Sequence, residues 1–174
     1  MIKPQIAEQL NVQLNRELFS AYFYLNLCTA AESAGFKGAA RWFMAKYREE
    51  TEHAMKIYRY LLDHGAKVIM ESIAKPHGEY DNLLAMFEAT LQHEQSVTES
   101  INDLVDSALT LKDHATYIFL QWFVTEQTEE EATVNDVISQ LKLVGLRGEG
   151  LYMIDKELAA LAANLVPAEQ TSTV

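Results

Sequence analysis

The sequence predicts an all-α protein: a four-helix bundle with one long crossover between its second and third helices, plus a short C-terminal fifth helix. Glycine and proline are scarce, with seven Gly and three Pro in 174 residues, and they fall between long segments. Those segments carry apolar residues at alternating steps of three and four, the spacing of one helix face. The length and the 49% hydrophobic content fit a single domain, residues 1–174, with a sizeable core.

The first two predicted helices span about residues 5–33 and 38–64. Pro4 suits a first helical turn, and Gly35 and Gly65 follow the two helices as stop signals. In each helix a glutamate interrupts the apolar stripe. The stripes are Leu10, Leu14, Glu17, Ala21, Tyr24 and Cys28, then Phe43, Tyr47, Glu50, Ala54, Ile57 and Leu61, with His53 one step around.

Residues 66–81 contain Pro76 and Gly78 and show no clear period, so they are predicted to form a connector. A helix of roughly 28 residues is about 42 Å long, and about 16 extended residues reach about 50 Å. The connector can therefore return along a whole bundle and is needlessly long for a tight turn. We expect the helices on either side of it to run parallel.

The third and fourth predicted helices span about 82–111 and 115–144, and the fifth covers about 150–163. The fifth is too short to be stable alone, so its apolar face must pack on this subunit or on a neighbour. The three stripes are Leu84, Phe87, Leu91, Glu94, Thr98, Ile101 and Val105; Leu120, Phe123, Gln127, Glu130, Val134, Val137 and Leu141; and Leu151, Ile154, Leu158 and Leu161.

The polar interruptions of the four long stripes repeat within the chain. Glu50 and His53 form an i, i+3 pair, so they project from one helix face and can hold one metal ion together. The arrangement of a lone Glu on one helix and a pair of ligand-type residues on the next occurs twice in the chain. Corresponding residues of the two copies are separated by a constant number of positions. The six residues are Glu17, Glu50, His53, Glu94, Gln127 and Glu130. Two hairpins related in this way place them at one level of the bundle, which predicts a dinuclear metal site.

For any one of these residues an explanation without metal is adequate. A single Glu usually lies at the edge of a stripe with its carboxylate in solvent, and His53 alone would be a hydrogen-bonded core histidine. The joint pattern is different, because burying several carboxylates together is costly unless protons or a cation compensate them. Carboxylates with one imidazole suit iron or manganese, whereas zinc does not account for so many carboxylates.

Composition excludes several classes of function. The net charge of −11, with no stripe of Lys and Arg, argues against nucleic acid. Cys28 is the one cysteine, which excludes a disulfide framework and a Cys-based zinc or iron–sulfur site within the chain. The N-terminus lacks the apolar core of a signal peptide, and no apolar run approaches the ~20 residues that span a membrane. We expect a soluble, cytoplasmic protein.

At these residues the chain resembles the bacterial non-haem ferritins over essentially its full length, including residues 148–152, which introduce the fifth helix. The six ligand-type residues match that family's ferroxidase centre. The pair Gln127 and Glu130, in place of Glu-x-x-His, is more similar to ferritins than to bacterioferritins, rubrerythrins or di-iron oxygenases. Bacterioferritins carry a haem-ligating Met directly after the helix-two Glu. Thr51 occupies that position here, so no haem is expected.

The resemblance implies a ferritin-like fold and iron storage in a homo-oligomeric shell of twenty-four subunits. Fe(II) would be oxidised by O2 or peroxide at a pair of irons and stored inside as ferric mineral. The resemblance assigns Glu17 and His53 to the first iron, Glu50 to a bridge, Glu94 and Glu130 to the second iron, and Gln127 to a hydrogen-bond partner or weak ligand.

Further roles follow from the same resemblance. Glu49, Glu126 and Glu129 match a third iron site found in bacterial members, with a merely solvated acidic face as the alternative. Tyr24 resembles the family tyrosine beside the centre, an electron donor. Trp122 could contribute too, although a core aromatic is the simpler interpretation.

Other functions remain open at this level. Animal ferritins line three-fold channels with two acidic residues, where this chain has Tyr117 and Leu120, so the resemblance does not extend to that route of iron entry. A di-iron peroxidase or oxidase without a storage role would use the same four helices. A DNA-protecting mini-ferritin builds its site across a subunit interface and has a helix in the crossover. A cytokine-type binding protein would leave the buried ligands unexplained.

Overall fold

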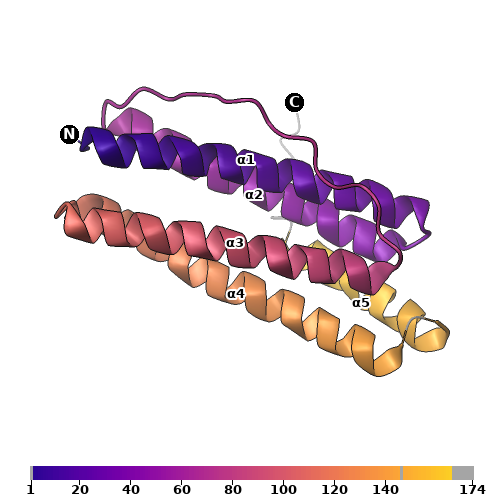
Figure 1. Cartoon of the computed structure of the whole chain (residues 1–174). Coiled ribbons are helices and arrows are strands. Elements are labelled where there is room, and N and C mark those ends of the chain that lie inside the picture. The colour runs from indigo at the N-terminus through magenta and orange to yellow at the C-terminus, as the bar shows by residue number, and fades with distance from the viewer. Residues whose placement is uncertain (1, 146, 166–174) are drawn as a thin grey trace, which may run out of the picture.

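The computed structural model describes residues 2–145 and 147–165, and within them it contains helices and no strand. The first four helices form two antiparallel hairpins, and the fifth lies across one end (Figure 1). The helices are α1 (Pro4–Ser33), α2 (Lys37–Asp63), α3 (Leu83–Thr110), α4 (His114–Val144) and α5 (Glu149–Leu165). The predicted fold class is confirmed. No helix among the described residues has the length and hydropathy needed to cross a membrane.

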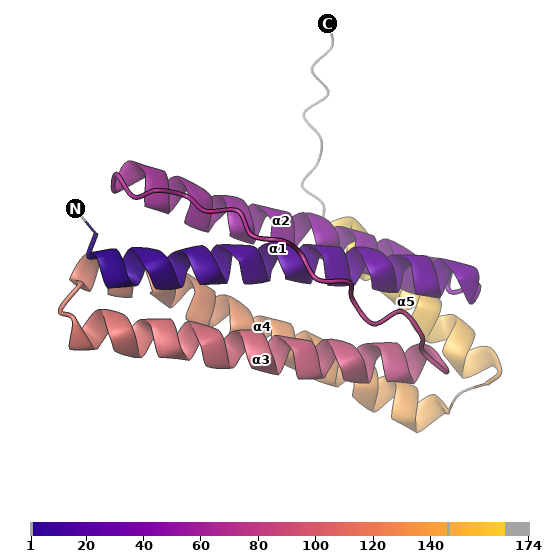
Figure 2. The same cartoon turned by 45° about the horizontal axis from the view of Figure 1, so that its top comes forward.

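The crossover between α2 and α3 runs along α1 for most of its length, so α2 and α3 run parallel as predicted (Figures 1 and 2). Two asparagines on the outer face of α1 hold it in place. The side chain of Asn11 donates to the carbonyl of Lys67 at 3.0 Å and accepts from the amide of Ile69 at 2.7 Å. Asn15 donates to the carbonyl of Ile69 and accepts from the amide of Glu71, both at 2.9 Å. Each asparagine therefore bonds one carbonyl and one N–H group of the crossover backbone, as a neighbouring strand would.

The apolar core has two parts. One cluster, which includes Phe43 and Phe87, lies at the end of the bundle where α1 turns into α2 and where α5 packs. The other, which includes Leu10 and Ile57, fills the opposite end. Between the two clusters the four long helices bury polar side chains, and this polar layer contains the predicted ligands.

The buried face of α3 differs from the predicted stripe. Leu83, Thr90, Val97 and Leu104 are buried, whereas Leu84, Leu91, Thr98 and Val105, each one residue later, are only partly buried. Since α3 packs against α1 as well as α4, its buried sector is wider than one stripe. Its centre lies on the side of the residues one position before the predicted ones. Periodicity alone does not reveal a second neighbouring helix.

α5 packs on its own subunit, mainly against α2. Leu158 is buried there, while Leu161, which was predicted on the same face, is 43% exposed. The carboxylate of Asp155 accepts hydrogen bonds from the backbone N–H groups of Gly38 at 3.0 Å and Ala39 at 2.9 Å. Those groups lie in the first turn of α2, where helical N–H groups have no partner within the helix and the helix dipole favours an anion. Asp155 thus caps α2 from a distant part of the chain.

Gly38→Ala is expected to displace α5. A Cβ at this position would lie 1.6 Å from the carbonyl oxygen of Asp155, so the two helices would have to separate. We expect a clear fall in melting temperature and rapid proteolysis within α5. Gly78→Ala is the matched control, because its Cβ would meet the Asn26 side chain at an ordinary 3.7 Å. Parent-like melting and protease resistance in Gly38→Ala would contradict this packing.

Candidate metal centre

The six predicted ligands all lie in the polar layer, and each is at most 5% exposed. α1 and α3 contribute one residue each, and α2 and α4 contribute a pair each. The residues are Glu17 and Glu94, then Glu50 with His53 and Gln127 with Glu130. Carboxylates at the edge of a stripe would be solvated, so that alternative is wrong for these positions.

Three of the residues converge around one point. His53 Nδ1 lies 3.5 Å from Glu50 Oε2 and 4.0 Å from Glu17 Oε2. One ligand atom from each residue can be chosen so that all lie within 4.8 Å of one another. Two carboxylates and an imidazole at these separations could hold an ion such as Fe(II) or Mn(II).

The opposite side of the layer is organised around Glu94. The hydroxyl of Tyr24, which is fully buried, donates to Glu94 Oε1 at 2.5 Å. The side-chain amide of Gln127 donates to Glu94 Oε2 at 3.1 Å and to the Glu94 carbonyl at 3.2 Å. Both carboxylate oxygens of Glu94 are therefore held in place, and in this structure Gln127 acts as a hydrogen-bond partner.

Burial and mutual repulsion favour protons on three of the carboxyl groups. Burial, followed by the charge of Glu50, raises the pKa of Glu17 well above its usual range. The same two causes raise the pKa of Glu94 to about 8. Burial raises the pKa of Glu130 to about 7, with Lys46 opposing this rise and Glu50 adding to it. A cation bound here would displace these protons.

Glu50 is the exception. Burial favours its neutral form, but the hydrogen bond and charge of His53, with the charge of Lys46, lower the pKa of Glu50. Burial acts to lower the pKa of His53, but Glu50 and Glu17 together raise it to about 9. The metal-free layer therefore pairs a Glu50 carboxylate with a His53 imidazolium at neutral pH.

Lys46, a buried cation in the same layer, was not predicted from the sequence. The residue is 3% exposed, and its ammonium donates to Glu49 Oε2 at 2.6 Å and to Glu130 Oε1. A signal was present, because Lys46 lies one helical turn before Glu50 and so shares its face. The side chain of a lysine can also extend outward to solvent, however, and the spacing does not distinguish the two outcomes.

Gln13 is a second buried polar residue that was not predicted. Its amide donates to Glu17 Oε1 at 2.7 Å, and its carbonyl oxygen accepts from the hydroxyl of Ser100 at 2.6 Å. Gln13 lies one turn before Glu17 on α1, a spacing at which helical side chains meet. It fixes the orientation of the Glu17 carboxylate from α1, with support from α3.

The residues predicted for a third iron lie on the outer side of the layer. Ligand atoms of Glu49, His53 and Glu126 lie within 4.8 Å of one another, and both glutamates are partly buried. Glu129 is exposed. A cavity of about 350 Å³ reaches Glu49, His53 and Glu126, and Trp122 also lines it. Trp122 is 39% exposed, with its ring centroid 5.2 Å from that of His53. The interpretation of Trp122 as a core aromatic is therefore wrong, because its ring faces this cavity.

The positions that line channels in animal ferritins carry no carboxylate in this chain. Leu120 is fully buried in the apolar cluster farther from α5, and Tyr117 is partly buried beside it. The 350 Å³ cavity, by contrast, connects the exposed side of α2 with His53.

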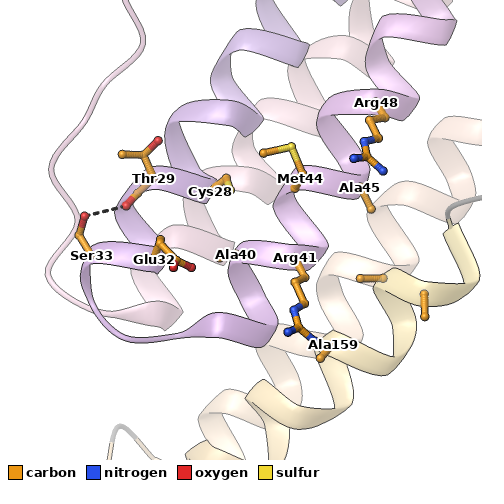
Figure 3. A pocket seen from close by; sticks show the side chains of 12 residues that line it. Cys28, Thr29, Glu32, Ser33, Ala40, Arg41, Met44, Ala45, Arg48 and Ala159 are labelled. Carbon is orange, nitrogen blue, oxygen red and sulfur yellow. Dashed lines mark hydrogen bonds between the residues drawn. The ribbon is translucent and has the colours of Figure 1, made fainter.

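A larger cavity, of about 650 Å³, lies between α1, α2 and α5 (Figure 3). Cys28, Met44 and several alanines form its walls, and the side chains of Arg41 and Arg48 lie at its border. Glu32 adds a carboxylate at the rim. Two arginines beside one acid do not suit a metal cation, so we exclude this cavity from the metal centre.

All four long helices of this single-crossover bundle contribute carboxylates, an amide or a histidine at one level. This arrangement defines the class of ferritin-like carboxylate metal proteins. A family model of the ferritin-like domain matches residues 7–144. The bacterial non-heme ferritin of Escherichia coli O6:H1 (strain CFT073) is 40% identical over 161 residues, which cover 92% of this chain and 98% of the relative. This chain belongs to the ferritin family.

Other relatives agree with that assignment. The bacterial non-heme ferritin of Campylobacter jejuni subsp. jejuni is 37% identical over 162 residues, covering 93% of this chain and 97% of the relative. The solved structure of an open pore ferritin from the hyperthermophilic archaeon Archaeoglobus fulgidus superposes with a TM-score of 0.89 at 41% identity. That superposition covers 91% of this chain and 96% of the archaeal chain.

Proposed function

We propose that this protein oxidises Fe(II) to Fe(III) at a dinuclear centre within each subunit and stores the ferric product inside a homo-oligomeric shell. The position of Glu50 carries the proposal. It interacts with His53 and Glu17 on one side of the layer. Its charge also raises the pKa of Glu94 and Glu130 on the other side. A carboxylate so placed is suited to bridge two ions.

The roles proposed from sequence fit this geometry. Glu17 and His53 bind the first iron, Glu50 bridges, and Glu94 with Glu130 binds the second, while Gln127 orients Glu94. Anionic oxygen ligands favour Fe(III) over Fe(II), so the ligand set lowers the barrier to losing an electron. Each Fe(II) gives one electron to O2 or peroxide. The protons displaced from the carboxyl groups leave as the irons bind.

Tyr24 is placed to supply a further electron. Its hydroxyl donates to Glu94 at 2.5 Å, so a proton lost on oxidation of the phenol has an acceptor at hand. Glu49, Glu126 and Glu129 are proposed to hold a third iron. Thr51, in the position of a haem-ligating Met, fits a centre without haem.

Exposed apolar side chains support assembly into a shell, proposed as twenty-four subunits. Val12 on α1 is 55% exposed, and Met70 and Ile73 on the crossover are 56% and 45% exposed. α1 and the crossover lie side by side (Figure 2), so both segments offer apolar side chains that a neighbouring subunit would cover in a shell. The acidic composition and single cysteine fit the cytoplasmic location predicted from sequence.

Aerobic loading with Fe(II), followed by size-exclusion chromatography, tests the proposal. We expect a large particle that co-elutes with ferric iron, and a particle of similar size by light scattering before iron is added. A small species that oxidises Fe(II) without retaining it would instead indicate a di-iron oxidase or peroxidase. A stable iron-free monomer or dimer at physiological salt would contradict the shell.

A further inference from the structure

The buried ammonium of Lys46 has no role in the centre proposed so far. Lysine is rarely buried unless it is paired, and Lys46 is paired twice, with Glu49 and with Glu130. The two partners come from different helices, α2 and α4. The ammonium therefore joins these helices at the edge of the dinuclear centre.

The surroundings of Lys46 form a small cavity of about 200 Å³. Its acidic lining consists of Glu49, Glu126, Glu129 and Glu130, and Leu161 and Leu165 of α5 also line it. The first three acids are those proposed for the third iron. Lys46 thus occupies, with a fixed positive charge, the space into which the candidate ligands of a third ion face.

We propose that Lys46 is a tethered cation that competes with metal at this outer site, so that a third ion binds Glu49 and Glu130 only when the ammonium withdraws. The inference rests on the proposed function, because it assumes that the central pair binds iron. Its consequence is selectivity between sites: the central pair fills first, and the outer site holds metal weakly.

Charge and geometry both support the competition. Each hydrogen bond to the ammonium uses a carboxylate oxygen that a metal ion would also need, and two cations a few ångströms apart in a buried site repel strongly. Withdrawal as a neutral amine is not an easy alternative. Burial acts to lower the pKa of Lys46, but the charges of Glu130, Glu49 and Glu50 outweigh it and raise that pKa.

Lys46 also compensates charge while metal is absent. The layer contains several carboxylates, and Lys46 and His53 are the cations in contact with them. Removal of Lys46 should therefore have two effects of opposite sign. It should strengthen metal binding at the outer site and lower the stability of the metal-free protein. A purely structural lysine would not produce this combination.

Anaerobic calorimetric titration of the iron-free protein with Fe(II) tests the proposal in Lys46→Met. We expect one additional ion per subunit, or a dissociation constant for the third ion at least about tenfold lower than in the parent. Lys46→Arg keeps the charge and should resemble the parent. Lys142→Met is the control for net charge, since Lys142 is 58% exposed and lies on α4, paired with Glu88. Adding Glu49→Ala to Lys46→Met removes a carboxylate that the ammonium and the third ion share, and it should abolish the additional binding.

A second readout uses no iron. The melting temperature of the metal-free Lys46→Met protein should fall, because Glu49 and Glu130 lose their shared partner. If that variant does not fold, Lys46→Gln supplies the same test, because a neutral amide can still donate to a carboxylate. Equal stoichiometry and equal third-ion affinity in the parent and the neutral variant would overturn the proposal. If the parent binds no Fe(II) at the central pair, the proposed function fails instead, and the two failures are distinguishable.

Discussion

Replacing Glu50 with alanine is expected to abolish the rapid oxidation of Fe(II) added at two ions per subunit. Glu50 interacts with both halves of the layer, and in the proposed centre it bridges the two irons, so its loss would remove a ligand from each. Loss of an outer partner of a metal ligand costs about 10–100-fold in affinity or activity, and loss of a bridging ligand should cost more than about 100-fold. Stopped-flow absorbance during aerobic mixing measures the initial rate.

The fold should survive this substitution. The charge of Glu50 raises the pKa of the neighbouring acids Glu17 and Glu94, so its removal relieves repulsion in the metal-free protein. Lys46 keeps its hydrogen bonds to Glu49 and Glu130. The loss of the Glu50 partner of His53 acts in the opposite direction. Since the two effects offset each other, we expect an unchanged particle size and a melting temperature close to that of the parent.

Two comparison variants sharpen the result. Glu52→Ala removes an exposed carboxylate from the same helix two residues away, and it should oxidise iron like the parent. Glu130→Gln should weaken mainly the second iron and leave one tight Fe(II) site per subunit. Fast, parent-like oxidation in Glu50→Ala would overturn the assignment of the dinuclear centre.

The positions of the predicted ligands could be read from the sequence for a definite physical reason. A charged residue at an apolar position of a helical stripe must either be solvated at the edge or be compensated inside, and four such positions at matching depth favour the second. Glu17 and Glu94 are examples, since both are 1% exposed. The fold followed from the same periodicity, together with the length of the connector.

The features that were missed depend on contacts between distant segments or on a rotamer. Nothing local to Asp155 indicates that it caps the first turn of α2, and nothing in α1 shows that Asn11 pairs with crossover backbone. Lys46 could have extended to solvent, and its ammonium turns inward to Glu130 of α4 beneath residues of α5 that line the same cavity. Periodicity identifies a buried face, but it does not identify the partner of each side chain.

The metal-free protein is expected to lose stability as the pH rises from about 5 to about 8. Glu94 and Glu130 hold protons in the folded state up to pKa values of about 8 and about 7, whereas the unfolded chain releases them near pH ~4.3. Between those limits the folded state binds more protons, so the free energy of unfolding falls with rising pH. His53 acts in the same direction, because its raised pKa of about 9 gives stability that is lost as the pH rises through that value. The lowered pKa of Glu50 acts oppositely, but only in acid below this window.

Glu94→Gln isolates the contribution of Glu94 to the pH dependence of stability. The amide is neutral at every pH and similar in size, and its oxygen can still accept the hydrogen bond from Tyr24. Melting temperatures measured in chelator across this pH range should fall less steeply than in the parent, with the variant the more stable of the two near pH ~8. Glu88→Gln is the control, because Glu88 is 51% exposed and lies on the same helix.

A metal ion requires deprotonated carboxylates, so added Fe(II) under anaerobic conditions should stabilise the parent most at the alkaline end of this pH range. A parent melting temperature that is flat or rises across this range would show that the buried carboxyl groups do not hold protons in the folded state.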